Sequence, residues 1–185
     1  DNSLDFTDKK VVISGSGNVA IYAMEKALQF GAKVIACSDS SGYIYDPNGI
    51  DLQLLKTIKE IKRGRISEYL KIHPNATFDN NCSKIWTIKC DIALPCATQG
   101  ELNIDDAKQL VSNGIIAIGE GANMPCSLDA INYFISNNVL FAPSKAANAG
   151  GVSVSALEMS QNAMRYTWTF GEVDTKMHNI MNDIY

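Results

Sequence analysis

A glycine-rich turn between a β-branched segment and an amphipathic segment is the clearest chemical signal in the sequence. Residues 15–20, Gly-Ser-Gly-Asn-Val-Ala, have the spacing of a GxGxxA motif. Gly15 suits a tight turn, Gly17 lets a pyrophosphate approach the backbone, and Ala20 allows a helix to pack closely on a strand. The N–H groups of the helix that opens near Asn18 favour a bound anion. The motif predicts a dinucleotide-binding turn, and a tight turn that binds nothing is the alternative.

A second group of polar residues follows the next predicted strand. Asp39 lies where an acidic residue hydrogen-bonds an adenosine ribose, which favours NAD because a carboxylate repels a 2′-phosphate. Ser40 and Ser41 come next and offer two hydroxyl donors. Further along the chain is a basic cluster made of Lys59, Lys62, Arg63 and Arg65. This cluster is either a source of positive charge for the site or a solvated helix end. These residues alone leave the choice between NAD and NADP open.

The elements that position these residues follow from the hydrophobic pattern. Residues 10–14 are β-branched and apolar, and residues 32–37 form a second such run. Between them, one helical face carries Ala20, Met24, Ala27 and Leu28, and Gly31 then ends the helix. Residues 10–38 are therefore predicted to form one βαβ unit.

Apolar runs continue to alternate with helix-period segments along the rest of the chain. Further strands are predicted at residues 91–95, 115–119 and 139–142. Helices are predicted on the face formed by Leu52, Leu55, Ile58 and Ile61, at residues 105–111, from a cap at Ser127 to Ile135, and beyond Gly151. The pattern predicts an α/β protein with a Rossmann-like, doubly wound, mostly parallel sheet and helices on both faces. Residues 64–86 carry no recognisable block.

Composition narrows the function classes. The net charge of −4 argues against nucleic acid as the main partner, and no apolar run approaches a membrane span. Five widely spaced cysteines, without a CxxC pair and with only two histidines, indicate no metal site and a reducing, cytoplasmic compartment. The polar start lacks a signal peptide and an initiator Met, so we expect a piece of a longer protein.

Several blocks of sequence, taken in order, resemble one family. They are residues 12–20 at the glycine turn, 38–42 (SDSSG), 91–99 (DIALPCATQ), 120–125 (EGANMP), 143–152 (PSKAANAGGV) and 155–162 (SALEMSQN). Together they resemble the nucleotide-binding half of hexameric, NADP-preferring glutamate dehydrogenases, over nearly the whole chain. Ordered blocks of this kind are more specific than one glycine motif.

The resemblance implies cofactor contacts at two places. Ser16, Asn18 and Val19 would contact the pyrophosphate, and Ser40 would contact the 2′-phosphate of NADP. NAD remains an alternative cofactor.

The resemblance also implies a nicotinamide side. Ala97 and Thr98 would line the dinucleotide groove, and Thr98 and Gln99 would approach the nicotinamide. Asn123 and Asn148 carry amides that suit a ribose hydroxyl or a carboxamide. Asn123 is alternatively only a turn residue, and Asn148 alternatively caps the last helix.

Two further residues are implied to meet the substrate. Val152 and Ser155 lie one helical turn apart, and Ser155 would donate to the γ-carboxylate of glutamate. A packed small residue is the alternative for Ser155. A branched or aromatic substrate would favour an apolar residue there, so these positions favour glutamate.

The resemblance implies reversible, NADP-dependent oxidative deamination of L-glutamate to 2-oxoglutarate and ammonia. Residues 1–185 would form the dinucleotide-binding domain, and the lysine and aspartate for the amine chemistry would lie in an absent N-terminal domain that also builds a homo-hexamer. No catalytic residue is assigned in this chain, which alone would be inactive. The alternatives are an NAD-dependent dehydrogenase of leucine, phenylalanine or valine, and a non-catalytic dinucleotide sensor.

Overall fold

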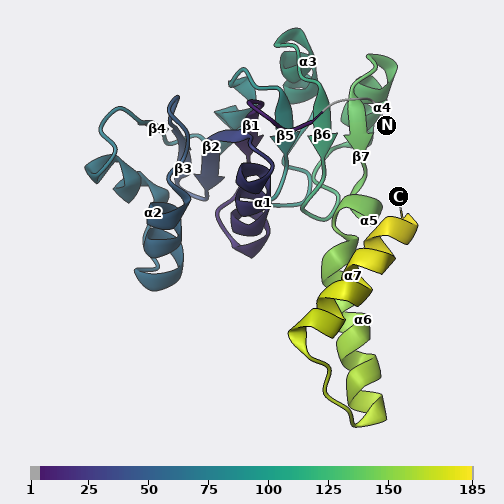
Figure 1. The fold of residues 1–185 in the computed structure, drawn as a ribbon. Helices are drawn as coiled ribbons and strands as arrows, with labels where there is room; N and C mark the ends of the chain where they lie inside the picture. Colours follow the sequence, from purple (N-terminus) through teal and green to yellow (C-terminus); the bar gives the residue numbers. More distant parts are fainter. Residues whose placement is uncertain (1–4, 185) are drawn as a thin grey trace.

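The protein is built around one seven-stranded sheet, which a computed structural model describes together with its helices for residues 5–184. The strand order is β4-β3-β2-β1-β5-β6-β7 (Figure 1). The strands are β1 (Lys10–Ile13), β2 (Lys33–Asp39), β3 (Gly42–Tyr45), β4 (Thr77–Asp79), β5 (Ile92–Leu94), β6 (Ala117–Gly119) and β7 (Leu140–Ala142). β2, β1, β5, β6 and β7 are mutually parallel, whereas β3 pairs antiparallel with both of its neighbours. The predicted mostly parallel sheet is confirmed.

The first βαβ unit forms as the sequence predicts. Helix α1 (Asn18–Gln29) joins β1 to β2, and Gly31 adopts a φ of 81°, the left-handed conformation that ends helices. Ala20, Met24 and Ala27 are buried as expected. Leu28 is exposed instead, and Ile21 takes its place on the buried face.

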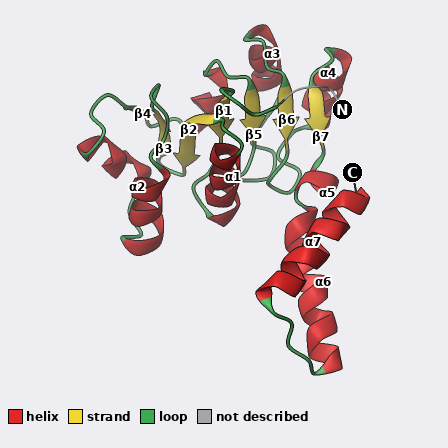
Figure 2. Cartoon of the chain, viewed as in Figure 1, coloured by secondary structure: helices red, strands yellow, loops and turns green. Residues whose placement is uncertain are grey.

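Helices cover both faces of the sheet, as Figure 2 shows in red against the yellow strands. One core cluster joins β1 and β2 to α1, α2 (Leu52–Lys56) and the 3₁₀ segment η2 (Ile66–Lys71). The opposite cluster joins the sheet to the 3₁₀ segment η3 (Cys82–Thr87), α3 (Ile104–Ser112) and α4 (Leu128–Ser136). The doubly wound arrangement is therefore confirmed.

The segment after β2 departs from the predictions. The strands β3 and β4 were not predicted, and Gly42 lies so close to β4 that an added Cβ would overlap the Asp79 carbonyl oxygen. After α2 the chain continues as the π-helical segment η1 (Thr57–Ile61). Because a π-turn contains more residues than an α-turn, Ile61 leaves the face shared by Leu55 and Ile58 and is 77% exposed.

The topology places a crevice beside the glycine turn. β2 and β5 lie on opposite sides of β1, so the chain reverses its winding direction at β1 and β5. Ligands of open α/β sheets bind at the carboxyl ends of strands at such a switch point. The chain then leaves β7 through α5 (Ser144–Ala147) into α6 (Ala149–Met164) and α7 (Phe170–Ile184), which extend away from the sheet (Figure 1).

The α6–α7 pair buries little surface. α6 buries only Ala149, and within the described residues of α7 no side chain is fully buried. On α7, Met177, Ile180 and Met181 are half-buried, whereas Ile184 is exposed. Within residues 5–184, no helix is both long enough and apolar enough to cross a membrane.

Candidate functional site

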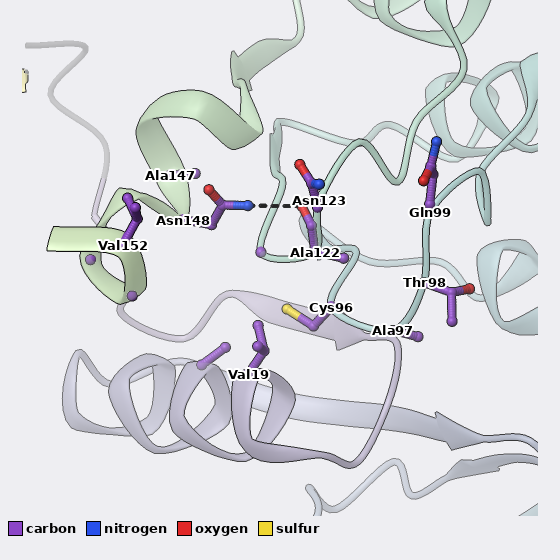
Figure 3. Close-up of a pocket in the computed structure, with 14 residues that line it drawn as sticks. Val19, Cys96, Ala97, Thr98, Gln99, Ala122, Asn123, Ala147, Asn148 and Val152 are labelled. Carbon is purple, nitrogen blue, oxygen red and sulfur yellow. Dashed lines mark hydrogen bonds between the residues drawn. The ribbon is translucent and has the colours of Figure 1, made fainter. Parts of the chain in front are cut away.

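A cleft of about 760 Å³ opens at the carboxyl edge of the sheet, where the winding reverses. Its walls come from the start of α1, the loops after β5 and β6, and the α5–α6 junction (Figure 3). The sequence-predicted residues that line it are Val19, Ala97, Thr98, Gln99, Asn123, Asn148 and Val152. The other lining residues are Ala23, Cys96, Gly121, Ala122, Ala147, Gly150 and Gly151. The structure thus brings together residues that lie up to 133 positions apart in the sequence, from Val19 to Val152.

Gly15 makes the turn after β1 and holds it against two neighbouring strands. Its φ is 85°, and its N–H donates to Ser38 Oγ at 2.8 Å. A Cβ on Gly15 would lie 3.1 Å from the Cys96 carbonyl oxygen and 3.2 Å from the Ala97 Cα. Conformation and space therefore both require glycine here. Ser14 completes the contact by accepting a hydrogen bond from Cys96 N–H at 2.8 Å.

Gly17 is the N-cap of α1 and has a different role. A Cβ at Gly17 would meet no atom within 4 Å, and no side chain caps the helix. The first intrahelical bond of this turn runs from Ile21 N–H to the Gly17 carbonyl, so the N–H groups before Ile21 have no intrahelical acceptor. Asn18 and Val19 are exposed, whereas Ser16 is buried. The helix start is therefore open to an anion, whereas Ser16 is shielded from solvent.

Asp39 is already engaged by the protein. One carboxylate oxygen accepts from the backbone and hydroxyl of Ser41, and the other accepts from Lys59 Nζ at 3.3 Å and Ile66 N–H at 3.1 Å. Burial alone raises the pKa of Asp39, but these hydrogen bonds outweigh burial and lower the pKa below its usual value. The four acceptor sites of the carboxylate are filled within the protein.

Ser40, next to Asp39, is turned toward the basic cluster. Arg65 Nη1 donates to Ser40 Oγ at 2.6 Å, and both residues are exposed. Within this cluster, Lys59 neutralises Asp39, and Lys59 Nζ also donates to the Gly64 carbonyl at 3.1 Å. The edge after β2 therefore presents a hydroxyl and a guanidinium together.

Glu101 organises the loop after β5 and was not predicted. Its Oε1 accepts from the backbone N–H groups of Ala97 and Thr98 at 3.0 and 3.2 Å. Burial raises the pKa of Glu101, partly offset by these bonds and one from Ser14. No family block or motif marked Glu101, because its partners are two backbone N–H groups and the distant Ser14 hydroxyl, which a sequence does not reveal.

Cys96 lines the cleft but is not an ionised thiol. Burial, with a smaller effect of Glu101, raises the pKa of Cys96 to about 12. A thiol with this pKa stays protonated near neutral pH, so it acts as a small apolar wall residue.

The two asparagines reach the cleft from different loops. Asn123 is exposed at its rim, and Asn148 Nδ2 donates to the Ala122 carbonyl at 3.2 Å (Figure 3). Asn148 occupies the N-cap position of α6, but its side chain makes no capping hydrogen bond. The alternative in which Asn148 merely caps the helix is therefore wrong, because its side chain bridges to the loop after β6 instead.

Val152 and Ser155 are placed differently from each other. Val152 lines the cleft and is 70% exposed. Ser155, one turn further along α6, lies outside the lining, and its Oγ donates to the Gly151 carbonyl at 3.3 Å. The other predicted site residues outside the lining are Gly15, Ser16, Gly17, Asn18, Asp39 and Ser40. Ser38 connects the end of β2 to the glycine turn.

Gly121 allows three walls of the cleft to meet. A Cβ at Gly121 would lie 2.5 Å from Cys96 Sγ and 3.2 Å from Val19 Cγ1. Gly121 lies in the block of residues 120–125, but no sequence pattern indicates this packing role. Its lack of a side chain lets the loop after β6 close on α1 and on the loop after β5.

Comparison with known proteins gives a consistent result across the whole chain. The model of the Glutamate/Leucine/Phenylalanine/Valine dehydrogenase family matches residues 1–185. An NAD(P)-specific glutamate dehydrogenase of Xylanibacter ruminicola is 53% identical over 180 residues, covering 96% of this chain and 40% of the relative. An NADP-specific glutamate dehydrogenase of Haemophilus influenzae is 51% identical over 183 residues, covering 97% of this chain and 40% of the relative.

Solved structures agree with the sequence matches. Glutamate dehydrogenase of Plasmodium falciparum superposes with a TM-score of 0.87 at 50% identity, covering 95% of this chain and 38% of that one. A hetero-hexameric glutamate dehydrogenase of Thermus thermophilus superposes with a TM-score of 0.85 at 23% identity, covering 98% and 41%, which shows the fold alone. The chain spans about 40% of the length of the curated relatives it matches.

The close packing at Gly121 leads to a stability prediction. Gly121→Ala is expected to lower the free energy of unfolding by about 1–3 kcal/mol, because the new methyl group overlaps Cys96 Sγ. Urea unfolding followed by circular dichroism measures the change. Gly171→Ala is the matched control, because a Cβ there meets no atom within 4 Å. Equal unfolding midpoints for the two variants would contradict the close approach at Gly121.

Proposed function

Because the chain belongs to the glutamate/leucine/phenylalanine/valine dehydrogenase family, we propose that it is the dinucleotide-binding domain of an NADP-dependent glutamate dehydrogenase. The observation that carries the proposal is the uncapped start of α1 at Gly17, which opens beside the cleft at the switch point. Unpaired N–H groups and the helix dipole there suit a pyrophosphate. Gly15, Ser16, Gly17, Asn18 and Val19 form this phosphate turn.

The choice of NADP over NAD rests on the residues after β2. Asp39 is neutralised by Lys59 and has its acceptor sites filled, so its carboxylate is poorly placed to repel a 2′-phosphate. Ser40 and Arg65 together offer a hydroxyl and a guanidinium, the donors that phosphate oxygens favour. We assign the 2′-phosphate to Ser40 and Arg65, and we assign Asp39 the role of holding this edge.

The rest of the cleft suits the nicotinamide half. In this proposal, Ala97, Thr98 and Gln99 line one wall, and the amides of Asn123 and Asn148 lie across from them (Figure 3). Amides that both donate and accept can orient a ribose hydroxyl and a carboxamide. When bound, the nicotinamide supplies the hydride chemistry, and this chain holds and orients it.

The substrate would meet this chain at α6. Val152 lines the cleft, and Ser155 is proposed to donate to the γ-carboxylate of glutamate. Ser155 Oγ is held by the Gly151 carbonyl, so the hydroxyl must turn from this acceptor to reach a substrate. This chain contributes no acid–base pair to the proposal. Residues for the amine chemistry are assigned to the part of the enzyme beyond it, so residues 1–185 alone are expected to be inactive.

The assembly and location of the enzyme are also proposals. The Thermus thermophilus relative is a hetero-hexamer, and we propose a homo-hexamer for the complete protein. We place it in the cytoplasm because its five cysteines are all free, which suits a reducing compartment. L-glutamate, 2-oxoglutarate and ammonia are the proposed substrates and products.

Calorimetric titration of the complete protein with NADPH, and separately with NADH, tests the function. Tighter binding of NADPH is expected, because only the 2′-phosphate engages Ser40 and Arg65. Tighter binding of NADH would support the rival interpretation, an NAD-dependent dehydrogenase of leucine, phenylalanine or valine. Binding of neither would refute dinucleotide binding and leave the family fold without this function.

The phosphate turn is tested by Gly17→Val. The variant should stay folded, because the space around Gly17 is open and its backbone is extended, with a small fall in melting temperature since valine is a poorer N-cap than glycine. Affinity for NADPH should fall roughly a hundredfold or more, because two charge-assisted backbone hydrogen bonds are each worth about 1.5–3 kcal/mol. Unchanged affinity in the folded variant would remove the turn from the site.

The 2′-phosphate assignment is tested by Ser40→Asp. A carboxylate at residue 40 would repel the phosphate and compete for Arg65, so NADPH affinity should fall roughly 10–100-fold. NADH affinity should be almost unchanged. Lys71→Ala, an exposed charge change on η2, is the control and should alter neither affinity. An unaltered ratio of NADPH to NADH affinity in Ser40→Asp would exclude Ser40 from the site.

A further inference from the structure

Glu120 is a buried carboxylate immediately after β6, and the proposed function gives it no role. Its exposed fraction is 2%, and it does not line the cleft. An ionisable side chain that is buried in this way needs hydrogen-bond partners, because desolvation of an unpaired carboxylate is costly. Both of its oxygens are in fact hydrogen-bonded, and both donors are backbone N–H groups.

The two donors belong to the two segments that carry Asn123 and Asn148. Cys126 N–H donates to Glu120 Oε1 at 3.2 Å, at the end of the loop that carries Asn123. Ser144 N–H donates to Glu120 Oε2 at 2.8 Å, at the start of α5. One side chain therefore joins the loop after β6 to the turn after β7.

The bond to Ser144 acts as the cap that α5 otherwise lacks. The N-cap residue of α5 is Pro143, which makes no side-chain capping hydrogen bond. A carboxylate at a helix N-terminus satisfies an N–H group and favours the helix dipole. The C-cap of α5 is Asn148, whose N–H donates to the Ser144 carbonyl at 3.0 Å. Glu120 thus fixes the first residue of the short helix that ends at Asn148.

A second connection closes a ring around the cleft wall. Asn148 Nδ2 donates back to the Ala122 carbonyl at 3.2 Å, two residues after Glu120 (Figure 3). The same loop is tied to the end of β5, because Gly121 and Ala122 donate to the Pro95 carbonyl at 3.0 and 2.9 Å. Glu120 and Asn148 therefore hold the same two segments together from opposite ends.

We propose that Glu120 is a positioning residue for the cofactor, which sets the separation of the two amides at Asn123 and Asn148. This inference rests on the proposed function, in which both amides contact the nicotinamide half of NADP. Glu120 does not touch the cofactor. It fixes the position of the loop after β6 relative to α5, so that both amides face the cleft.

The test is a double-mutant cycle in the complete protein, with NADPH as the probe. Glu120→Gln replaces one acceptor oxygen by an NH₂ group, which must face a backbone N–H donor. NADPH affinity is expected to fall about tenfold, the loss of one charge-assisted hydrogen bond in the wall that holds the amides. In the Asn148→Ala background, the same change is expected to cost less than about threefold, because the amide that it positions is already gone.

Stability is measured in parallel, because a purely structural role would appear there. Glu120→Gln should lower the melting temperature whether Asn148 is present or replaced by alanine. Asp106→Asn is the matched control, since Asp106 also accepts a backbone N–H, from Asn103 at 3.0 Å, but lies at the start of α3. This control should lower the melting temperature without changing NADPH affinity.

A second variant keeps the proposal testable if Glu120→Gln does not fold. Ser144→Pro removes the N–H group that donates to Glu120 and leaves the Glu120 carboxylate in place. Proline is favoured at the first position of a helix. The ψ of 152° at Pro143 is compatible with a following proline. This variant should also weaken NADPH binding about tenfold, again with a smaller effect in the Asn148→Ala background.

The outcomes separate this inference from the proposed function. Equal losses of affinity in both backgrounds, or a loss of stability without a loss of affinity, would overturn the positioning role while NADPH still binds the unaltered protein. Failure of the unaltered protein to bind either NADPH or NADH would overturn the proposed function, and this inference with it.

Discussion

The close approach of the glycine turn to the loop after β5 is the constraint on which the rest of the site depends. Gly15 is held between Ser38 and Cys96, and any side chain at Gly15 would press against the Cys96–Ala97 backbone. This contact brings β1, β2 and β5 to one point at their carboxyl ends. The open helix start, the polar edge after β2 and the cleft wall at Ala97 are neighbours because of it. Gly121 allows a similar close approach at the Cys96 side chain, where the loop after β6 packs against Cys96 and Val19.

Three carboxylates then hold the loops in place around this contact. Asp39 fixes Ser41 and Ile66, Glu101 fixes Ala97 and Thr98, and Glu120 fixes Cys126 and Ser144. In each case an acidic side chain accepts hydrogen bonds from backbone N–H groups that have no partner in a helix or a strand. An acidic residue near a dinucleotide site is easily interpreted as a ligand contact. Here the acceptor sites of Asp39 are filled by donors of the protein itself, so this acidic residue holds the loop in place instead.

The sequence predicted what local patterns specify and missed what depends on distant partners. The strand, turn and helix from Lys10 to Asp39 follow from β-branched runs, helical spacing and glycine placement, and they form as expected. The pairing of β3 with β4 was missed because it joins residues more than thirty positions apart, and its key requirement is the fit of Gly42 against Asp79. Ile61 was misplaced because the period changes from an α-turn to a π-turn within one amphipathic run. Glu101, Glu120 and Gly121 were missed as site-organising residues for the same reason, since backbone partners and close approaches have no sequence pattern.

The two sides of the cleft differ in how firmly they are held. Thr98 and Ala97 are attached to a buried carboxylate, and Ala122 is attached to Pro95, so the loops after β5 and β6 are anchored in the sheet. Val152 and Ser155 lie on α6, which buries only Ala149, so few apolar contacts restrain them. Segments with little buried surface open at a lower free energy than the core. The α5–α6 junction is where this weakly buried helix joins the anchored loops, and Glu120 and Asn148 both act there. In the proposed function, the cofactor contacts would therefore stay fixed while α6 adjusts to a substrate, because the hydrogen bonds that anchor this wall end at Asn148, directly before α6.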